Sequence, residues 1–161
     1  MVDDGIDLFD LSADGASLFY TVGVERTEEP WKELRDRYSD LEYGHGVTTF
    51  SEIWRLDLVT WRAKRLLAGD RVVHAFDATP DGTRLALLTT PDNEVIHVEG
   101  WSVVEVLEAG ASEPTLVTTE GWRASHPSPF GWIDDVAWAD CCEVKHLLYD
   151  TSGRRHVHSA D

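Results

Sequence analysis

Side chains that could bind a metal ion gather near the end of the chain. Thiols and imidazoles are zinc ligands, and this region contains Cys141, Cys142, His146, His156 and His158. If the last two histidines lie on a strand, alternation places them on one face of a sheet. The two cysteines are adjacent, however, and lack the two-residue spacer that is common in structural zinc sites. We therefore predict neither a metal site nor a cofactor, and interpret these residues as solvated tail residues and two small buried thiols.

The other acidic and histidine side chains do not form a recognisable catalytic set. Glu28 and Glu29 stand at the start of an expected helix, where carboxylates favour the helix dipole. Asp134 and Asp135 are interpreted as solvated turn residues that open a strand. Four isolated histidines are interpreted as structural or exposed, namely His45, His74, His97 and His126. The sequence contains no Gly-x-Ser-x-Gly nucleophile elbow, so we assign no catalytic residue and leave any substrate-binding residues unknown.

A Gly-x-Gly pair at Gly44 and Gly46 could suggest a phosphate-binding loop. Thr49 stands where a nucleotide fingerprint needs its third glycine, and no expected strand immediately precedes the pair. We therefore predict no phosphate site there.

A hairpin motif is repeated along the chain, and its strands are the elements that would position a functional site. Its clearest copy is Val72–Thr89, in which two β-prone runs flank Thr79-Pro80-Asp81-Gly82. Pro80 presets a turn φ, and Gly82 accepts the positive φ that a tight hairpin needs. The same phrase occurs at Leu11–Gly15 and, degraded, at Val136–Asp140. Three copies of one hairpin indicate a repeat architecture.

Alternating apolar residues between the turns predict short strands in blades of four. We expect an all-β fold, a partial β-propeller of about two and a half four-stranded antiparallel blades, with a β-sandwich as the main alternative. Only the middle blade, which contains the central hairpin, is expected to be covered on both sides. The expected blades are blade A over about 7–68 with an insertion at 25–46, blade B over about 72–119, and an incomplete blade C over about 133–158.

Two further features complete this interpretation. The insertion is expected to be helical near residues 28–41 because Pro30 suits a first turn and apolar residues recur at steps of three and four. The tail after Gly153 is expected to end blade C abruptly instead of continuing it. Five tryptophans are interpreted as core or inter-blade packing, namely Trp54, Trp101, Trp122, Trp132 and Trp138.

Composition limits the classes of partner. The chain has 161 residues, 42% of them hydrophobic, which is enough for one folded domain with a core. Its formal charge of −16 argues against nucleic acid, because phosphate binding needs concentrated basic groups. No run approaches the ~20 apolar residues of a membrane span, and Met1–Asp4 does not begin a secretory signal, so we expect no membrane partner and a cytoplasmic location. An extracytoplasmic location is the alternative if the chain is truncated at its N-terminus. The acidic, Lys-poor composition fits either adaptation to high salt or a soluble protein from an Arg-favouring genome.

The strand Ile53–Leu58, the Asp-Gly hairpins, and Pro127–Trp132 before Val136–Trp138 carry a family resemblance. Together they resemble the N-terminal propeller of prolyl-oligopeptidase-family serine peptidases, in the dipeptidyl peptidase and acylaminoacyl peptidase branch, and TolB-like propellers share the same repeat. The resemblance runs from residue 7 to about residue 149. It implies a seven- or eight-bladed propeller followed by an α/β-hydrolase domain, whose nucleophile elbow this sequence lacks. The residues around Glu28 and Glu29 do not match the glutamate motif of dipeptidyl peptidases, so that role is not transferred.

Fewer than three blades cannot close a ring, and apolar blade faces would then be exposed at both ends. The chain could be a portion of a longer peptidase, could self-associate, or could pair with another chain through its exposed blade edges. We expect a non-catalytic propeller portion that covers the hydrolase active site and restricts access to short peptides. A peptide substrate would then bind only in the context of the full-length peptidase. The alternative is a stand-alone propeller-type module that binds proteins or acts as a scaffold.

Overall fold

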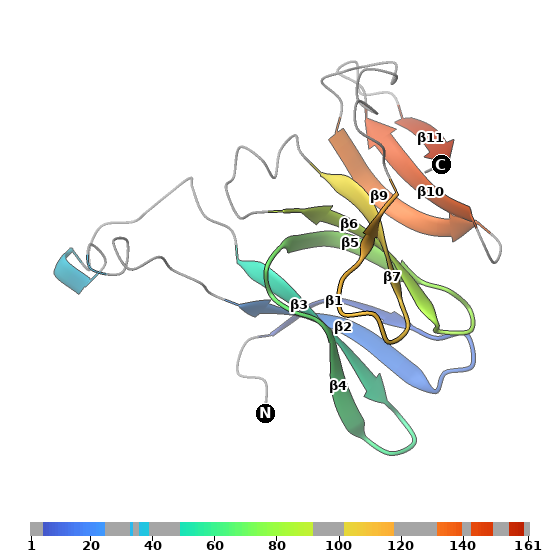
Figure 1. Cartoon of the computed structure of the whole chain (residues 1–161), viewed down its shortest axis with the longest axis horizontal. Coiled ribbons are helices and arrows are strands. Elements are labelled where there is room, and N and C mark those ends of the chain that lie inside the picture. Colours follow the sequence, from blue (N-terminus) through green and yellow to red (C-terminus); the bar gives the residue numbers. More distant parts are fainter. Residues whose placement is uncertain are drawn as a thin grey trace.

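A computed structural model describes residues 5–24, 33, 36–38, 49–91, 102–117, 132–139, 143–149 and 155–159. These residues form three antiparallel sheets, and within each sheet every strand pairs with the next strand along the chain (Figure 1). The first sheet contains β1 (Ile6–Leu11), β2 (Ser17–Val24), β3 (Phe50–Asp57) and β4 (Arg62–Leu67). The second contains β5 (Val72–Ala78), β6 (Arg84–Thr90), β7 (Val103–Glu108) and β8 (Thr115–Leu116). The third contains β9 (Trp132–Ala139), β10 (Glu143–Tyr149) and β11 (Arg155–Ser159).

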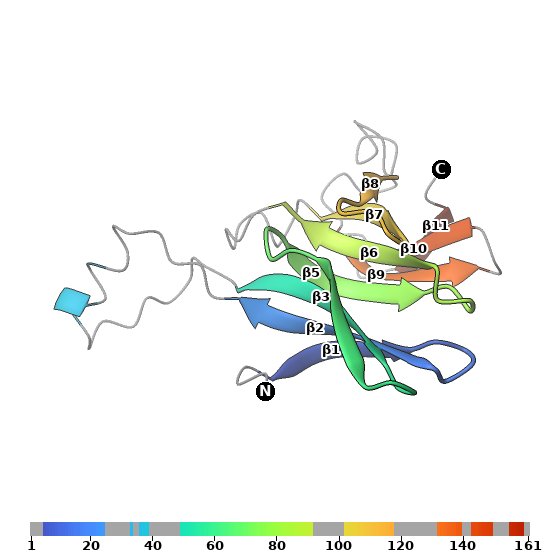
Figure 2. The same cartoon turned by 60° about the horizontal axis from the view of Figure 1, so that its bottom comes forward.

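The three sheets stack face to face in chain order, as Figure 2 shows from a second direction. Their first strands β1, β5 and β9 are neighbours, with β5 between the other two. This arrangement of meandering sheets around adjacent first strands is that of consecutive propeller blades. It confirms the predicted all-β partial propeller.

Two apolar cores hold the stack together, one on each side of the second sheet. The core between the first and second sheets is made of Phe19, Ile53, Leu67, Val73, Leu85, Leu87 and Leu107. The core between the second and third sheets is made of Ala86, Leu88, Val104, Ile133, Val136 and Val144. Alternate residues of a strand face opposite sides of its sheet, so the second sheet contributes to both cores.

Strand β6 explains why the middle sheet is covered on both faces. Leu85 and Leu87 point into the first core, whereas Ala86 and Leu88 point into the second. All four are at most 2% exposed. A continuous apolar run is what a strand buried on both faces requires, and the prediction for the central hairpin is confirmed here.

The turn between β1 and β2 closes through side-chain and backbone bonds together. Ser12 donates its hydroxyl hydrogen to Asp14 Oδ1 over 2.6 Å, and Asp14 Oδ1 also accepts the Ala16 N–H over 2.9 Å. The Gly15 N–H donates to the carbonyl of Ser12 at 2.8 Å. Gly15 has a φ of 68°, which a residue without Cβ adopts readily.

The turn between β5 and β6 repeats these bonds at the equivalent residues. Thr79 donates its hydroxyl hydrogen to Asp81 Oδ1 over 2.7 Å, and the Thr83 N–H donates to the same oxygen over 3.1 Å. The Gly82 N–H donates to the Thr79 carbonyl over 2.7 Å, and Gly82 has a φ of 66°. The predicted repeat is thus a single turn design used twice, with serine or threonine two residues before the aspartate.

We expect the Asp81 turn to make stability depend on pH. Hydrogen bonds from Thr79 and Thr83 lower the pKa of Asp81 from 3.8 to about 2. A carboxyl whose pKa is lower in the folded state than in the unfolded state stabilises the fold at any pH above the unfolded-state pKa. That contribution is lost as the pH falls through the folded-state pKa. The difference in free energy of unfolding between wild type and Asp81→Asn should therefore be present at pH 6 and disappear between pH 4 and pH 2. Urea denaturation across this pH range measures it, and a difference that does not change with pH would contradict the assignment.

The third hairpin is shorter than the other two. Ala139 pairs with Glu143, so that only three residues lie between them, whereas Leu11 pairs with Leu18. A three-residue connection has no room for the Ser/Thr-x-Asp-Gly turn. This accounts for the degraded copy of the motif in the sequence.

The prediction that the tail ends blade C abruptly is wrong. β11 pairs antiparallel with β10, with Val157 opposite Leu147, and gives the third sheet a third strand. The segment can take this place because an edge strand needs pairing on one side only and tolerates many polar residues. Asp134 and Asp135 were also expected in a turn, but both lie within β9 with exposed side chains.

The helix predicted near residues 28–41 lies almost wholly outside the described residues. Within that range Glu33, Asp36 and Arg37 have helical backbone, and the helix as a whole stays a prediction. No helix in the part of the chain that the structure describes is long and apolar enough to cross a membrane.

Candidate functional site

Aspartates at one repeat position connect each sheet to the next. Asp10 and Asp77 each lie five residues before the glycine of their turn. Asp10 Oδ2 accepts the Ala78 N–H over 3.0 Å, which joins β1 to β5, and Asp77 Oδ2 accepts the Trp138 N–H over 2.7 Å, which joins β5 to β9. A carboxylate in each first strand thus fixes the first strand of the following sheet. Asp77 precedes Ala78, whose N–H Asp10 binds, and in β9 the residue that precedes Trp138 in the same way is Ala137, which has no acceptor side chain.

Asp77 lies in an acidic environment along these first strands. Burial raises its pKa, the Trp138 N–H opposes this effect, and the nearby charges of Asp10 and Asp135 raise the pKa further. The carboxylates are engaged by backbone amides, since Asp135 Oδ1 accepts the Val136 N–H over 2.9 Å. Among the described residues no group of three or more His, Cys, Asp or Glu side chains could hold a metal ion. We interpret this row as structural.

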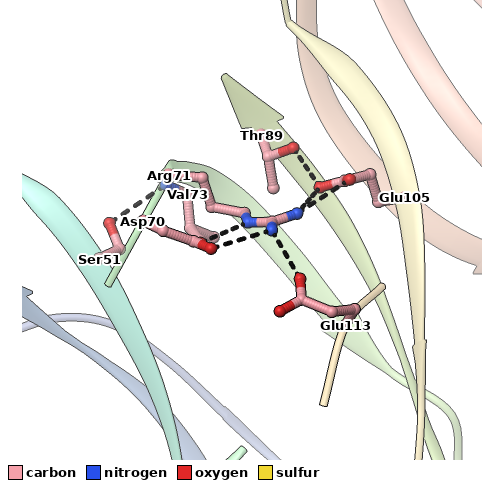
Figure 3. A network of polar contacts seen from close by, with 7 residues as sticks. All are labelled: Ser51, Asp70, Arg71, Val73, Thr89, Glu105 and Glu113. Carbon is pink, nitrogen blue, oxygen red and sulfur yellow. Dashed lines mark hydrogen bonds and ion pairs between the residues drawn. The ribbon is translucent and has the colours of Figure 1, made fainter. Parts of the chain in front are cut away.

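Arg71 is the centre of a polar network beside the first core (Figure 3). Its Nε lies 2.9 Å from Asp70 Oδ1, its Nη1 lies 3.0 Å from both carboxylate oxygens of Glu105, and its Nη2 lies 3.0 Å from Glu113 Oε2. Thr89 completes the cluster by donating its hydroxyl hydrogen to Glu105 Oε2 over 2.6 Å. The guanidinium therefore joins the segment before β5 to β7 and to the loop before β8.

The same residue also connects the two sheets through its backbone. The Ser51 N–H on β3 donates to the Arg71 carbonyl over 2.8 Å, and the Val73 N–H donates to Ser51 Oγ over 3.1 Å. Burial would lower the pKa of Arg71, but hydrogen bonds and ion pairs with Asp70 and Glu105 raise it above its ordinary value. Every nitrogen of the guanidinium is engaged by a carboxylate. The network is therefore a structural clamp in which carboxylates occupy the whole guanidinium.

A groove of about 450 Å³ opens between the outer strands of the first sheet and the second sheet. We call it the interblade groove. Apolar core residues line it, together with four cationic side chains (Arg55, Lys64, Arg65 and Arg84), the carboxylate of Glu108, and the chain from residue 109 to 112. The residues that matter below are Arg55, Lys64, Leu66, Ala68, Glu108 and Ala109. Its volume is within the range of small-molecule sites.

The structure gives two of the predicted residues, His74 and Trp138, structural roles. His74 Nε2 lies 2.7 Å from Thr90 Oγ1, and burial lowers the His74 pKa, which favours the neutral imidazole. Trp138 donates its Nε1–H to the Asp77 carbonyl over 3.1 Å and stacks under the Arg84 guanidinium at 4.6 Å, which confirms inter-blade packing. Trp54 is half-buried on β3.

The predicted metal-capable residues are only partly placed. Register brings His146 and His158 opposite each other on β10 and β11, and His156 lies opposite Leu148. Several other predicted residues lie outside the described residues, namely Glu28, Glu29, Gly44, His45, Gly46, His97, Trp101, Trp122, His126, Cys141 and Cys142. The absence of a metal site at the tail therefore stays a prediction.

Sequence analysis missed three features of this region. The repeated Asp10 and Asp77 were visible as a fixed distance to the turn glycine. The interactions of Arg71 and the cationic rim of the groove join residues that are distant in sequence, and no local signal in a single sequence indicates them.

No protein-family model and no curated protein matches the chain. Among solved structures it is similar to a protein described as a dipeptidyl aminopeptidase IV from Bacteroides ovatus, with a TM-score of 0.57, 12% identity, and coverage of 94% of this chain and 22% of that one. It is also similar to an oligogalacturonate lyase from Vibrio parahaemolyticus, with a TM-score of 0.51, 10% identity, and coverage of 96% and 40%. The propeller domain of the Trilobed protease from Pyrococcus furiosus is similar with a TM-score of 0.49, 9% identity, and coverage of 99% and 44%.

This chain spans less than half of each of these proteins, and identities this low establish the fold alone. Together with the stacked sheets, the likeness to the first two of these structures shows a β-propeller fold.

Proposed function

We propose that the chain is a non-catalytic propeller portion of a prolyl-oligopeptidase-like serine peptidase. In that setting it covers the hydrolase active site and restricts access to short peptides. The likeness to a dipeptidyl aminopeptidase IV supports the peptidase setting, and this chain spans 22% of that protein. Peptide substrate is then bound only in the context of the full-length peptidase.

One observation carries the proposal that the chain is a portion of a larger assembly, and it concerns the outer face of the first sheet. Phe9 on β1 is 70% exposed and Leu11 is 52% exposed. The equivalent residues of β5, at the same distances before the turn glycine, are Phe76 and Ala78, and both pack against the core between the first and second sheets. The first sheet therefore presents to solvent the same face that the second sheet uses to pack on its neighbour.

We call this outer surface, with Ile6, Phe9 and Leu11, the free face. A large apolar surface on a sheet is a binding surface for another element. In the second sheet the equivalent residues, Phe76 and Ala78, pack against a neighbouring propeller sheet. We therefore propose that a further propeller sheet covers the free face. It could come from the same protein, from a second copy of the chain, or from another chain.

A stand-alone propeller-type module for protein binding is the second candidate. The likeness to an oligogalacturonate lyase supports it, because it shows this fold in a protein that is not named as a peptidase. The free face would then bind a partner protein directly.

The coding DNA on both sides of these residues distinguishes the two candidates. The peptidase proposal expects a continuing or neighbouring frame with further Asp-Gly hairpins and a Gly-x-Ser-x-Gly elbow. Flanking frames without a hydrolase domain would favour the binding module. We also expect the purified chain to leave a chromogenic peptide intact. Hydrolysis that a serine-directed inhibitor abolishes would overturn the non-catalytic role.

A further inference from the structure

The rim of the interblade groove contains two cations that face each other across a strand pair. Arg55 on β3 lies directly opposite Lys64 on β4, and both side chains are exposed. Like charges at directly opposite positions destabilise an antiparallel pair. The chain as a whole has a formal charge of −16, but β4 is locally basic and carries Arg62 and Arg65 beside Lys64.

The propeller repeat itself does not require this pair. Arg55 pairs with Phe19 on β2, and Phe19 lies four residues after the turn glycine Gly15. In the second sheet the residue four after the turn glycine Gly82 is Ala86, which pairs with Val106. Val106 therefore occupies the position of the arginine, and the residue opposite it is Thr115, where the first sheet has a lysine. The second sheet keeps neutral residues at both positions. The cations are a departure of the first sheet and not a feature of the repeat.

Both cations have donors available to a ligand. The Arg55 Nε–H donates to Ser17 Oγ over 2.9 Å, and the guanidinium carbon lies 5.9 Å from the centroid of the Phe19 ring. Among the residues that the structure describes, its two terminal nitrogens donate no hydrogen bond, and Lys64 has neither a hydrogen bond nor an ion pair. A guanidinium and an ammonium side by side are suited to a carboxylate or sulfonate.

Three carboxylates bear on this charge: Glu108 lines the groove, and Asp57 and Asp14 interact electrostatically with Arg55 while each also closes a turn. Asp57 Oδ1 accepts the N–H groups of Val59 and Thr60 at 2.9 and 2.8 Å, which closes the turn after β3. Asp14 closes the turn after β1 through its bond from Ser12. The positive rim of the groove is therefore only partly neutralised by the protein's own groups.

We propose that the interblade groove binds a small organic anion with an apolar body. The carboxylate or sulfonate would lie between Arg55 and Lys64, and the apolar part would lie against Leu66, Ala68 and Ala109, lining residues whose apolar surface is at least partly exposed. Both walls of the groove belong to sheets of this chain, so the site does not depend on what covers the free face.

Fluorescence titration with anilinonaphthalene sulfonate tests the site, with N-phenylnaphthylamine as the matched probe that lacks the anion. We expect Arg55→Gln and Lys64→Gln each to weaken sulfonate binding about tenfold, in line with one charge-assisted hydrogen bond partly exposed to water. Binding of the neutral amine should not change. Added salt should weaken only the sulfonate.

The control is Arg62→Gln, which removes one positive charge from β4 at a position opposite Asp57 and outside the groove lining. It should leave sulfonate affinity within about twofold of wild type. The same control accounts for probe bound on the free face, because that contribution is common to all three variants. Equal loss of affinity in the Arg62 and Arg55 variants, or equal affinity for the two probes, would overturn the proposal. So would a sulfonate that does not bind the wild-type chain.

Discussion

Replacing Leu87 with alanine is expected to lower the free energy of unfolding by about 3 kcal/mol. Leu87 lies in β6 with none of its surface exposed, in the core that joins the first and second sheets. Removing three heavy atoms there loses their burial and leaves a cavity, because the side chains of two different sheets cannot both relax into it. Urea denaturation monitored by circular dichroism measures the change.

The matched control for this change is Leu116→Ala. Leu116 lies in β8 and is 54% exposed, so the same deletion of atoms should change the free energy of unfolding by no more than about 0.5 kcal/mol. If both variants lost the same stability, Leu87 would not lie in a close-packed core between sheets.

Replacing Arg71 with methionine is expected to cost about 3 kcal/mol. Arg71 and Glu105 have side chains that are 15% and 12% exposed, and the two carboxylate oxygens of Glu105 both accept from the Arg71 guanidinium. Methionine keeps much of the apolar stem but leaves the Glu105 carboxylate in a poorly solvated place with Thr89 as its remaining donor. Thermal and urea unfolding of the variant would show the loss.

Glu113→Gln separates the buried part of this network from its exposed part. The Glu113 side chain is 66% exposed, and its ion pair with Arg71 is open to solvent, so its loss should cost under about 1 kcal/mol. A double variant, Arg71→Met with Glu105→Gln, should recover part of the stability lost in Arg71→Met because no unpaired charge remains. The clamp would be contradicted if Arg71→Met were no more destabilised than Glu113→Gln.

Local signals made much of the fold predictable. The Asp-Gly turns at Gly15 and Gly82 depend on residues within a few positions of each other, and their strands follow from alternation in the same segments. β11 was missed because its five residues, with two histidines and an arginine, carry no apolar alternation to distinguish an edge strand from a loop.

The site could not be predicted in the same way, because its contacts join distant residues. Arg71 and Glu105 are 34 positions apart and meet only once two strands have paired. The pairing of Arg55 with Lys64 depends on the register shift after Ile53, and shifting a strand by one residue would place the two cations on opposite faces. The aspartate links could have been predicted from the sequence, since Asp10 and Asp77 lie the same number of residues before their turn glycines.

The free face is tested most directly by light scattering over a range of protein concentration. We expect the wild-type chain to exceed its monomer mass of 18.1 kDa as concentration rises, because Phe9 and Leu11 present an uncovered sheet-packing surface. The double variant Phe9→Ser, Leu11→Ser should stay at 18.1 kDa and keep the thermal unfolding midpoint of the wild-type monomer, since neither side chain is in the core. A wild-type chain that remains monomeric at every concentration, together with a double variant that unfolds at a markedly lower temperature, would contradict the assignment of this face as the surface that packs a further sheet.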